Sequence, residues 1–500
     1  MNKYFQENKP IAGLGRASLH SGVIVLAAKC VGVVSQVVSM IVLARLLSPN
    51  DVGLTATIFA LIAFGPSLVD LGTSEATSQK THITEAEVSS LFWLNVAIGV
   101  ALTAVFAASS GLIASFYGEP ALGGIALAAS LTFVAAGFST QHSALLRRAM
   151  QFRSLAVVDI CSNLISSVLG IVMALTGWGY WALVAKNVLA PLLNLVGVWI
   201  SCPWVPGRPR LSKEAKESVR FGLGVAGFTM TDSIAQSADR LAIGYFLGPG
   251  ALGYYQNAYL FYTNLLSLLV SPLHNIAVSS LSKLKNNLDD FRRSWSVALS
   301  TLSFVSALAF ALLAVTGSDL IVMLLGEKWA AAGPLLCIFS VRGIAQAVER
   351  TLGWLHVPTG RSDRWMRWGF FNAIFQVLAV AGGLPFGLIG VTVAGAIAAY
   401  ILFLPALVYA GRPAGISTND VVAAVGPQTV AGLITIAFGL VVREAFLGDV
   451  SPITRFFVSL FGCTFVYLTV VMVVFKVTRP VQLGLSVLRD FNPMRLLRSS

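Results

Sequence analysis

Apolar stretches of about 20 residues recur along the whole chain and alternate with short polar gaps. A helix rises about 1.5 Å per residue, so about 20 apolar residues span the hydrocarbon core of a bilayer. The pattern therefore predicts an all-α polytopic membrane protein with about fourteen transmembrane helices. The predicted spans are residues 19–44, 52–72, 90–116, 121–146, 154–176, 178–201, 219–247, 251–280, 294–325, 331–355, 365–384, 386–410, 420–442 and 453–475.

Basic residues are distributed asymmetrically between these gaps. Most of the 34 Lys and Arg residues fall in every second gap, on the side that also holds both chain ends. Because cytoplasmic loops carry such an excess, both termini are expected in the cytoplasm, which requires an even number of spans. The net charge of +12 then faces anionic lipid, so nucleic acid is not the expected partner.

The polar connection 202–218, which contains three prolines, divides six predicted helices from the eight that follow. The sequence LSPNDVG at Leu47–Gly53 recurs as LGPGALG at Leu247–Gly253. With an even number of helices per lobe the two repeats run in parallel, a plan that transporters use for alternating access around a central cavity. The expected organisation is a cytoplasmic N-terminus at 1–18, an N-lobe at 19–201, the linker 202–218, a C-lobe at 219–410, two extra helices within 411–475, and a basic amphipathic cytoplasmic tail at 476–500.

Four cations lie inside predicted spans, where a charge costs at least about 2.5 to 3.5 kcal/mol. Lys29 and Arg342 are deepest and belong to different lobes, and Lys186 and Arg240 are the other two. We expect these cations to bind an anionic substrate group, with Gln36 on the same helix face as Lys29. Internal ion pairs and hydrogen bonds between helices are the alternative, and a structural Asp239–Arg240 pair is one example.

Carboxylates and aromatic residues complete the candidate site. Asp232, Asp239 and Glu349 are candidates for coupling transport to H⁺ or Na⁺, since the chain contains no nucleotide-binding motif. Tyr255, Tyr259 and Tyr262 share one helix face with Asn257 nearby, and such rings suit either sugar stacking or an interfacial aromatic belt.

The sequence contains no motif that indicates a catalytic or metal site. The five His residues show no metal-ligand spacing, and the five Cys residues contain no CxxC pair, so no metal, cofactor or disulfide is expected. The longest predicted outer connection has only about ten residues, too few for an extracytoplasmic catalytic domain. We therefore expect a transporter and not an enzyme.

Several segments, in their order along the chain, carry a family resemblance: Met40–Gly53, Leu68–Gly72, Phe152–Ala156, Gly177–Val184, Asp239–Gly244 and Leu252–Tyr255. They resemble the Wzx-type oligosaccharide flippases, particularly the branch for colanic acid and succinoglycan-like exopolysaccharides. The resemblance covers most of residues 20–410.

The resemblance implies membership of the superfamily that also contains multidrug exporters and the lipid II flippase. It implies a bacterial inner-membrane protein that moves undecaprenyl-diphosphate-linked repeat units for exopolysaccharide or lipopolysaccharide biosynthesis, with a polysaccharide polymerase or export machinery as a further partner. Lys29 is comparable with cationic cavity residues of the lipid II flippase by helix and depth. Tyr245 occupies a position where a basic residue is usual. A multidrug or organic-cation exporter and a membrane glycan polymerase or ligase are the rival functions.

Overall fold

The computed structural model describes residues 5, 32–80, 82–208, 233, 236–284, 287–448 and 450–477. Within these residues the regular structure is helical, and ten segments are long and apolar enough to cross a membrane. One of the ten, Asp363–Ala414, contains two successive helices, and every predicted span contains helical residues. The predicted all-α membrane architecture is confirmed.

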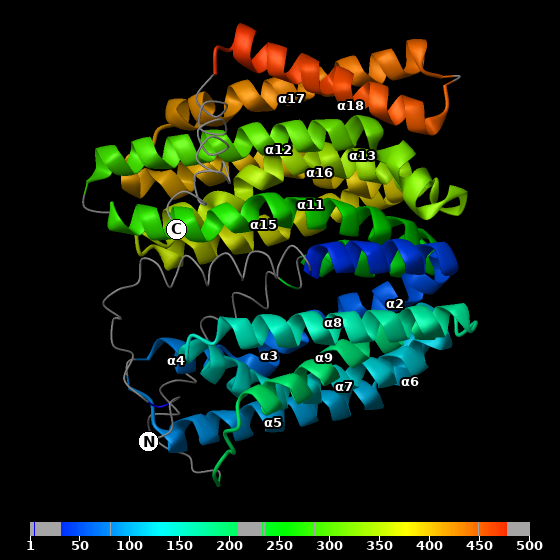
Figure 1. Ribbon diagram of the computed structural model, residues 1–500, viewed down its shortest axis with the longest axis vertical. Coiled ribbons are helices and arrows are strands. Elements are labelled where there is room, and N and C mark those ends of the chain that lie inside the picture. The colour runs from blue at the N-terminus through cyan, green and yellow to red at the C-terminus, as the bar shows by residue number, and fades with distance from the viewer. Residues whose placement is uncertain are drawn as a thin grey trace, which may run out of the picture. The chain divides into compact units, whose positions relative to one another are not determined.

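Most of the described helices follow one another with short connections (Figure 1). In chain order they are helix Gly32–Leu46, α2 (Pro49–Leu61), α3 (Gly65–Asp70), α4 (Thr73–Gln79), α5 (Glu85–Ala108), α6 (Ser110–Tyr117), α7 (Ala121–Arg148), α8 (Phe152–Leu175), α9 (Trp181–Ser201), helix 236–246, α11 (Gly248–Lys283), α12 (Leu288–Leu325), α13 (Ala332–Glu349), α14 (Gly353–His356), α15 (Ser362–Gly383), α16 (Gly387–Gly411), α17 (Thr418–Phe446) and α18 (Pro452–Thr469).

Local sequence explains where several helices begin. Ser48 accepts a hydrogen bond from the backbone N–H of Asp51, whose carboxylate accepts from the N–H of Ser48, and Pro49 starts α2. Ser417 and Asp420 form the same reciprocal box before α17. These side chains satisfy backbone donors that have no partner within the helix.

The predicted span 52–72 is interrupted twice in the structure. A turn separates α2 from α3, and Leu71 and Gly72 adopt positive φ angles of 46° and 69° before α4. The amide of Asn95 on α5 donates to the carbonyl of Val69 at 2.5 Å, while the backbone N–H of Ser74 donates to the carboxylate of Asp70 at 2.8 Å. These buried polar groups satisfy the broken backbone, which is the condition for non-helical structure inside a membrane.

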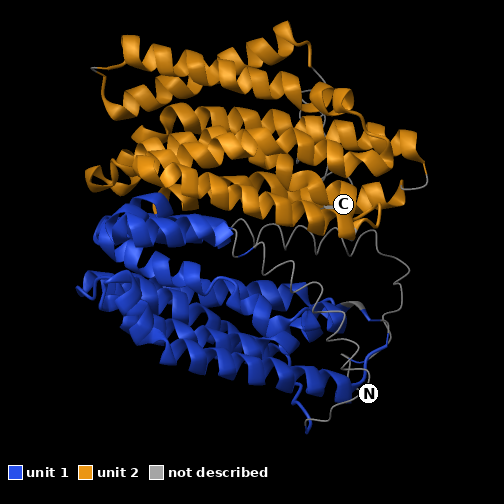
Figure 2. Ribbon diagram, turned by 180° about the vertical axis from the view of Figure 1, so that it is seen from behind, with its two compact units in different colours: residues 1–256 blue, residues 257–500 orange. Residues whose placement is uncertain are grey.

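The chain forms two compact units, Met1–Gln256 and Asn257–Ser500 (Figure 2). Phe92 and Trp204 lie in the buried core of the first unit. In the second unit α12 packs against α13, α17 and α18, so the helices α17 and α18 that follow residue 411 belong to this unit. The lobe boundaries expected from the linker stay predictions.

Candidate functional site

In the first unit, Lys186 on α9 lies against helix Gly32–Leu46. Its ammonium group donates a 2.9 Å hydrogen bond to the hydroxyl of Ser39, which is buried. Gly170 on α8 allows α9 to pack closely beside it at this position, because a Cβ there would lie 3.1 Å from the Cβ of Lys186. Gln36 is exposed on the same short helix, and Lys29 lies outside the described residues.

A second polar group joins helix 236–246 to the start of α11. The hydroxyl of Tyr255 donates to Oδ2 of Asp239 at 2.6 Å, and Nε of Arg240 lies 3.7 Å from Oδ1 of Asp239. Arg240 also donates to the carbonyl of Gln236 at 2.9 Å. The structure therefore brings three predicted site residues together, whereas Asp232 lies outside the described residues.

The second unit places Arg342 in a group formed by α11 and α13. Nε of Arg342 donates to Oε1 of Gln346 at 2.8 Å, and the Tyr262 hydroxyl donates to the same oxygen at 2.5 Å. The ring of Tyr262 stacks on Phe339 with centroids 5.3 Å apart. Arg342 and Gln346 are four residues apart and therefore share one face of α13, whereas the bond from Tyr262 on α11 is not visible in the sequence.

The predicted sugar-contacting residues differ in exposure. Tyr255 and Tyr262 are 1% and 2% exposed and direct their hydroxyls to protein acceptors, whereas Tyr259 is half-buried. Asn257 is buried, and so is Glu349 at the end of α13. Among the three tyrosines, Tyr259 therefore presents the most accessible ring.

Tyr245 occupies the position where a basic residue was expected from the family resemblance. Its ring stacks on Phe116 of α6, with centroids 4.6 Å apart, and makes an edge contact with Tyr117. Tyr245 thus provides an aromatic contact between helix 236–246 and α6.

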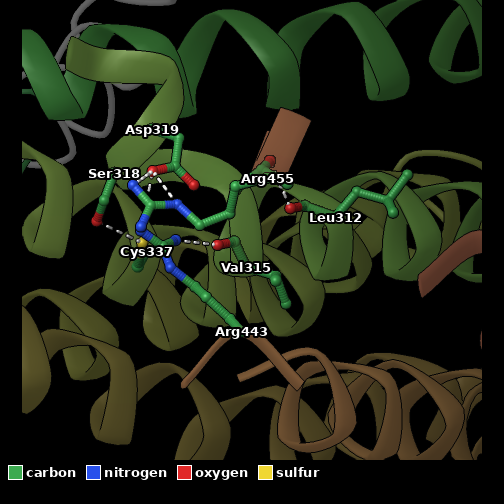
Figure 3. Close-up of polar contacts among 8 residues, drawn as sticks. Leu312, Val315, Ser318, Asp319, Cys337, Arg443 and Arg455 are labelled. Atoms are coloured by element: carbon green, nitrogen blue, oxygen red, sulfur yellow. Dashed lines mark hydrogen bonds and ion pairs between the residues drawn. The ribbon is translucent and has the colours of Figure 1, made fainter. Parts of the chain in front are cut away.

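One charged cluster was missed by sequence reasoning (Figure 3). Asp319 of α12 accepts from Nη2 of Arg443 on α17 at 3.1 Å and from Nε of Arg455 on α18 at 3.0 Å. Arg443 also donates to the carbonyl of Val315 at 2.6 Å. The available signal was a single carboxylate within the span 294–325 and two of the few basic residues assigned to the outer side.

The repeated segments contact each other, which was also missed. A Cβ on Gly53 of α2 would lie 1.6 Å from the carbonyl oxygen of Pro249, and one on Gly253 of α11 would lie 1.9 Å from that of Pro49. Both contacts fall within the first unit. Only glycine permits two helix backbones to approach so closely.

Comparison with known protein families decides the classification. Residues 42–334 match the model of a family described as "Polysaccharide biosynthesis protein". The chain belongs to this family. The matched region contains helices of both compact units, from helix Gly32–Leu46 to the start of α13.

Similar proteins from bacteria carry related names. The chain is 24% identical to the lipopolysaccharide biosynthesis protein WzxC of Escherichia coli over 71% of this chain and 73% of that protein. It is 26% identical to the succinoglycan biosynthesis transport protein ExoT of Rhizobium meliloti over 69% and 70%, respectively.

Solved structures share the fold. The lipid II flippase MurJ in an inward closed conformation matches with a TM-score of 0.71 and 14% identity over 91% of this chain and 99% of that chain. An inward-facing multidrug resistance transporter of the MATE family matches with a TM-score of 0.62 and 14% identity over 79% and 98%. At these identities the likeness concerns the fold.

Proposed function

We propose that this protein is a flippase that moves undecaprenyl-diphosphate-linked oligosaccharide repeat units across the bacterial inner membrane. The product would serve exopolysaccharide or lipopolysaccharide biosynthesis. The observation that carries the proposal is the family match over residues 42–334, supported by relatives named for polysaccharide biosynthesis and transport. Both termini would lie in the cytoplasm, as the distribution of basic residues predicts.

The cations inside the helices provide the chemistry for the diphosphate. Lys186 and Arg342 each lie within a hydrogen-bonded polar group, and Arg240 lies beside Asp239. Each of these cations, like Lys29, is a proposed contact for the diphosphate, because anionic oxygens form strong hydrogen bonds to Lys and Arg in a low dielectric. The polyprenyl chain would remain in lipid while the head group crosses.

Polar and aromatic residues would contact the sugar. The half-buried ring of Tyr259 is suited to stacking on a sugar face, and exposed Gln36 offers amide groups to hydroxyls. Tyr255, Tyr262 and Asn257 would support this surface from within the helices. Asp232, Asp239 and Glu349 are the proposed groups for coupling to H⁺ or Na⁺.

The close backbone contact between the repeated segments at Gly53 and Gly253 could serve as a gate in an alternating-access cycle. They join the beginnings of α2 and α11, which the predicted topology places on the outer side. A closed contact there excludes substrate from that side, and its separation would open the path outward.

The location of accumulated substrate tests the function. In cells depleted of the protein, lipid-linked oligosaccharide should accumulate in the inner leaflet, protected from an impermeant sugar-oxidising reagent added outside. Accumulation in the outer leaflet would instead indicate a polymerase or ligase. Drug sensitivity with normal polysaccharide output would indicate a multidrug exporter.

A further inference from the structure

The guanidinium of Arg342 lies between its own helix and α16. Its Nε donates to Gln346 one turn along α13, and the position of a Cβ on Gly395 of α16 lies 3.0 Å from Nη1. Helices α13 and α16 pack against each other in the second unit. Of the guanidinium atoms, Nη1 therefore lies nearest to the point where α16 lacks a side chain.

Gln346 is itself held in place. Its Oε1 accepts from the hydroxyl of Tyr262, which is buried and stacked on Phe339. Because the guanidinium is planar, a hydrogen bond at Nε together with the side chain's direction determines where both Nη groups point. The stacked rings of Tyr262 and Phe339 therefore hold the Gln346 amide, and this amide in turn holds the Arg342 guanidinium.

We infer that Gln346 and Gly395 are positioning residues that set the direction of the Arg342 guanidinium for a substrate diphosphate. This inference rests on the proposed function. Gln346 engages the Nε edge, and Gly395 leaves the space that the Nη groups need. Planar, bidentate recognition of phosphate oxygens depends on such alignment, which a displaced guanidinium loses.

The site permits a test that separates positioning from folding. Gly395 lies within the helix α16 and does not have a positive φ angle, so its backbone conformation is also accessible to Ala. The atom that a new Cβ meets is the end of a flexible side chain, so Gly395→Ala should displace Arg342 while thermal stability stays at the wild-type value. Gly382→Ala on α15 is the matched control, because a Cβ there meets nothing within 4 Å.

The measurement is the affinity of purified full-length protein in nanodiscs for undecaprenyl diphosphate. Arg342→Ala, Gln346→Leu and Gly395→Ala should each weaken binding by about tenfold, whereas Gly382→Ala should not. In an Arg342→Lys background, Gly395→Ala should have no further effect, because Lys lacks the planar group that Gly395 accommodates.

The outcomes are distinguishable from failure of the proposed function. If Arg342→Ala weakens binding but Gly395→Ala and Gln346→Leu bind like wild type, the positioning inference is overturned. If Gly395→Ala weakens binding equally in the Arg342→Lys background, its effect does not pass through the guanidinium and the inference is also overturned. The proposed function itself is judged separately, by the leaflet that holds accumulated substrate.

Discussion

Asp319 on α12 accepts a 2.6 Å hydrogen bond from Nη2 of Arg455 on α18, two residues separated by 136 positions in the chain. The carboxylate is 4% exposed and the Arg455 side chain 21%. Since Arg443 of α17 bonds to the same oxygen, one carboxylate connects the last two helices to the core of the second unit. Removal of Asp319 would leave two partly buried arginines without this counter-charge.

Substitution of Asp319 should therefore destabilise the protein. For Asp319→Ala we expect a loss of about 3 kcal/mol, because two partly buried arginines lose their counter-charge. Asp289→Ala is the control, since its 93% exposed carboxylate pairs with Arg292 on the surface and should change stability little. Thermal unfolding in detergent measures both, and equal melting temperatures for the two variants would contradict the prediction.

Side chains at the interlocked glycines should prevent closure of α2 on α11. Gly53→Ala or Gly253→Ala would place a Cβ less than 2 Å from a backbone carbonyl oxygen, so the helices must separate. Polymer export should fall at least about tenfold, since a transporter held open on one side does not cycle. Gly250→Ala lies in the same repeat with nothing within 4 Å of its Cβ and should export normally. Full export by the first two variants would exclude the gate.

A disulfide between α2 and helix 236–246 should stop transport reversibly. A Cβ on Gly244 lies 3.1 Å from Oγ1 of Thr57, a separation that suits Thr57→Cys paired with Gly244→Cys. In a background without native cysteines, oxidation should block export and a reducing agent should restore it. The two single-cysteine variants control for the substitutions. Undiminished export by fully cross-linked protein would show that these helices need not separate.

Loss of the Lys186 charge should abolish polymer export without affecting membrane insertion. Met has an unbranched side chain of similar length to Lys. The substitution Lys186→Met therefore retains most of the packing and removes the ammonium group that bonds to Ser39. We expect at least about tenfold less polymer, because a diphosphate in a low dielectric requires compensating charge. Arg153→Ala, at an exposed position near the start of α8, is the matched control. Normal export by Lys186→Met would remove this cation from the substrate site.

Acidification should reduce stability through His356, which lies on α14 outside the membrane-spanning segments. Burial, with a contribution from Arg364, lowers the pKa of this imidazole from 6.5 to about 4. Below pH 6.5 the unfolded chain therefore binds a proton that the folded protein excludes, so stability present at pH 7 decreases toward pH 4. The expected loss is roughly 2 kcal/mol between pH 7 and pH 5.

The melting temperature of detergent-solubilised protein across this pH range measures the effect. His356→Gln should flatten the pH dependence, whereas His82→Gln, at an exposed position, should retain it. Parallel pH profiles for wild type and His356→Gln would assign the dependence to other groups.

Local sequence determined the helices and their order. Apolar runs of membrane length predicted where the long described helices lie, and the boxes at Ser48 and Ser417 set the starts of α2 and α17, because these effects act over a few neighbouring residues. The spacing of Arg342 and Gln346 likewise placed both on one face of α13, and the repeat at Gly53 and Gly253 was visible as a pattern.

Tertiary structure decided which groups meet. Asn95 stabilises the break after Asp70, Tyr255 and Tyr262 turn their hydroxyls to Asp239 and Gln346, and Asp319 finds its arginines on helices more than 120 residues away. Periodicity gives the face of a helix but not the neighbour that the face contacts. Burial of polar groups in an apolar environment requires specific partners, and only the packed fold supplies them.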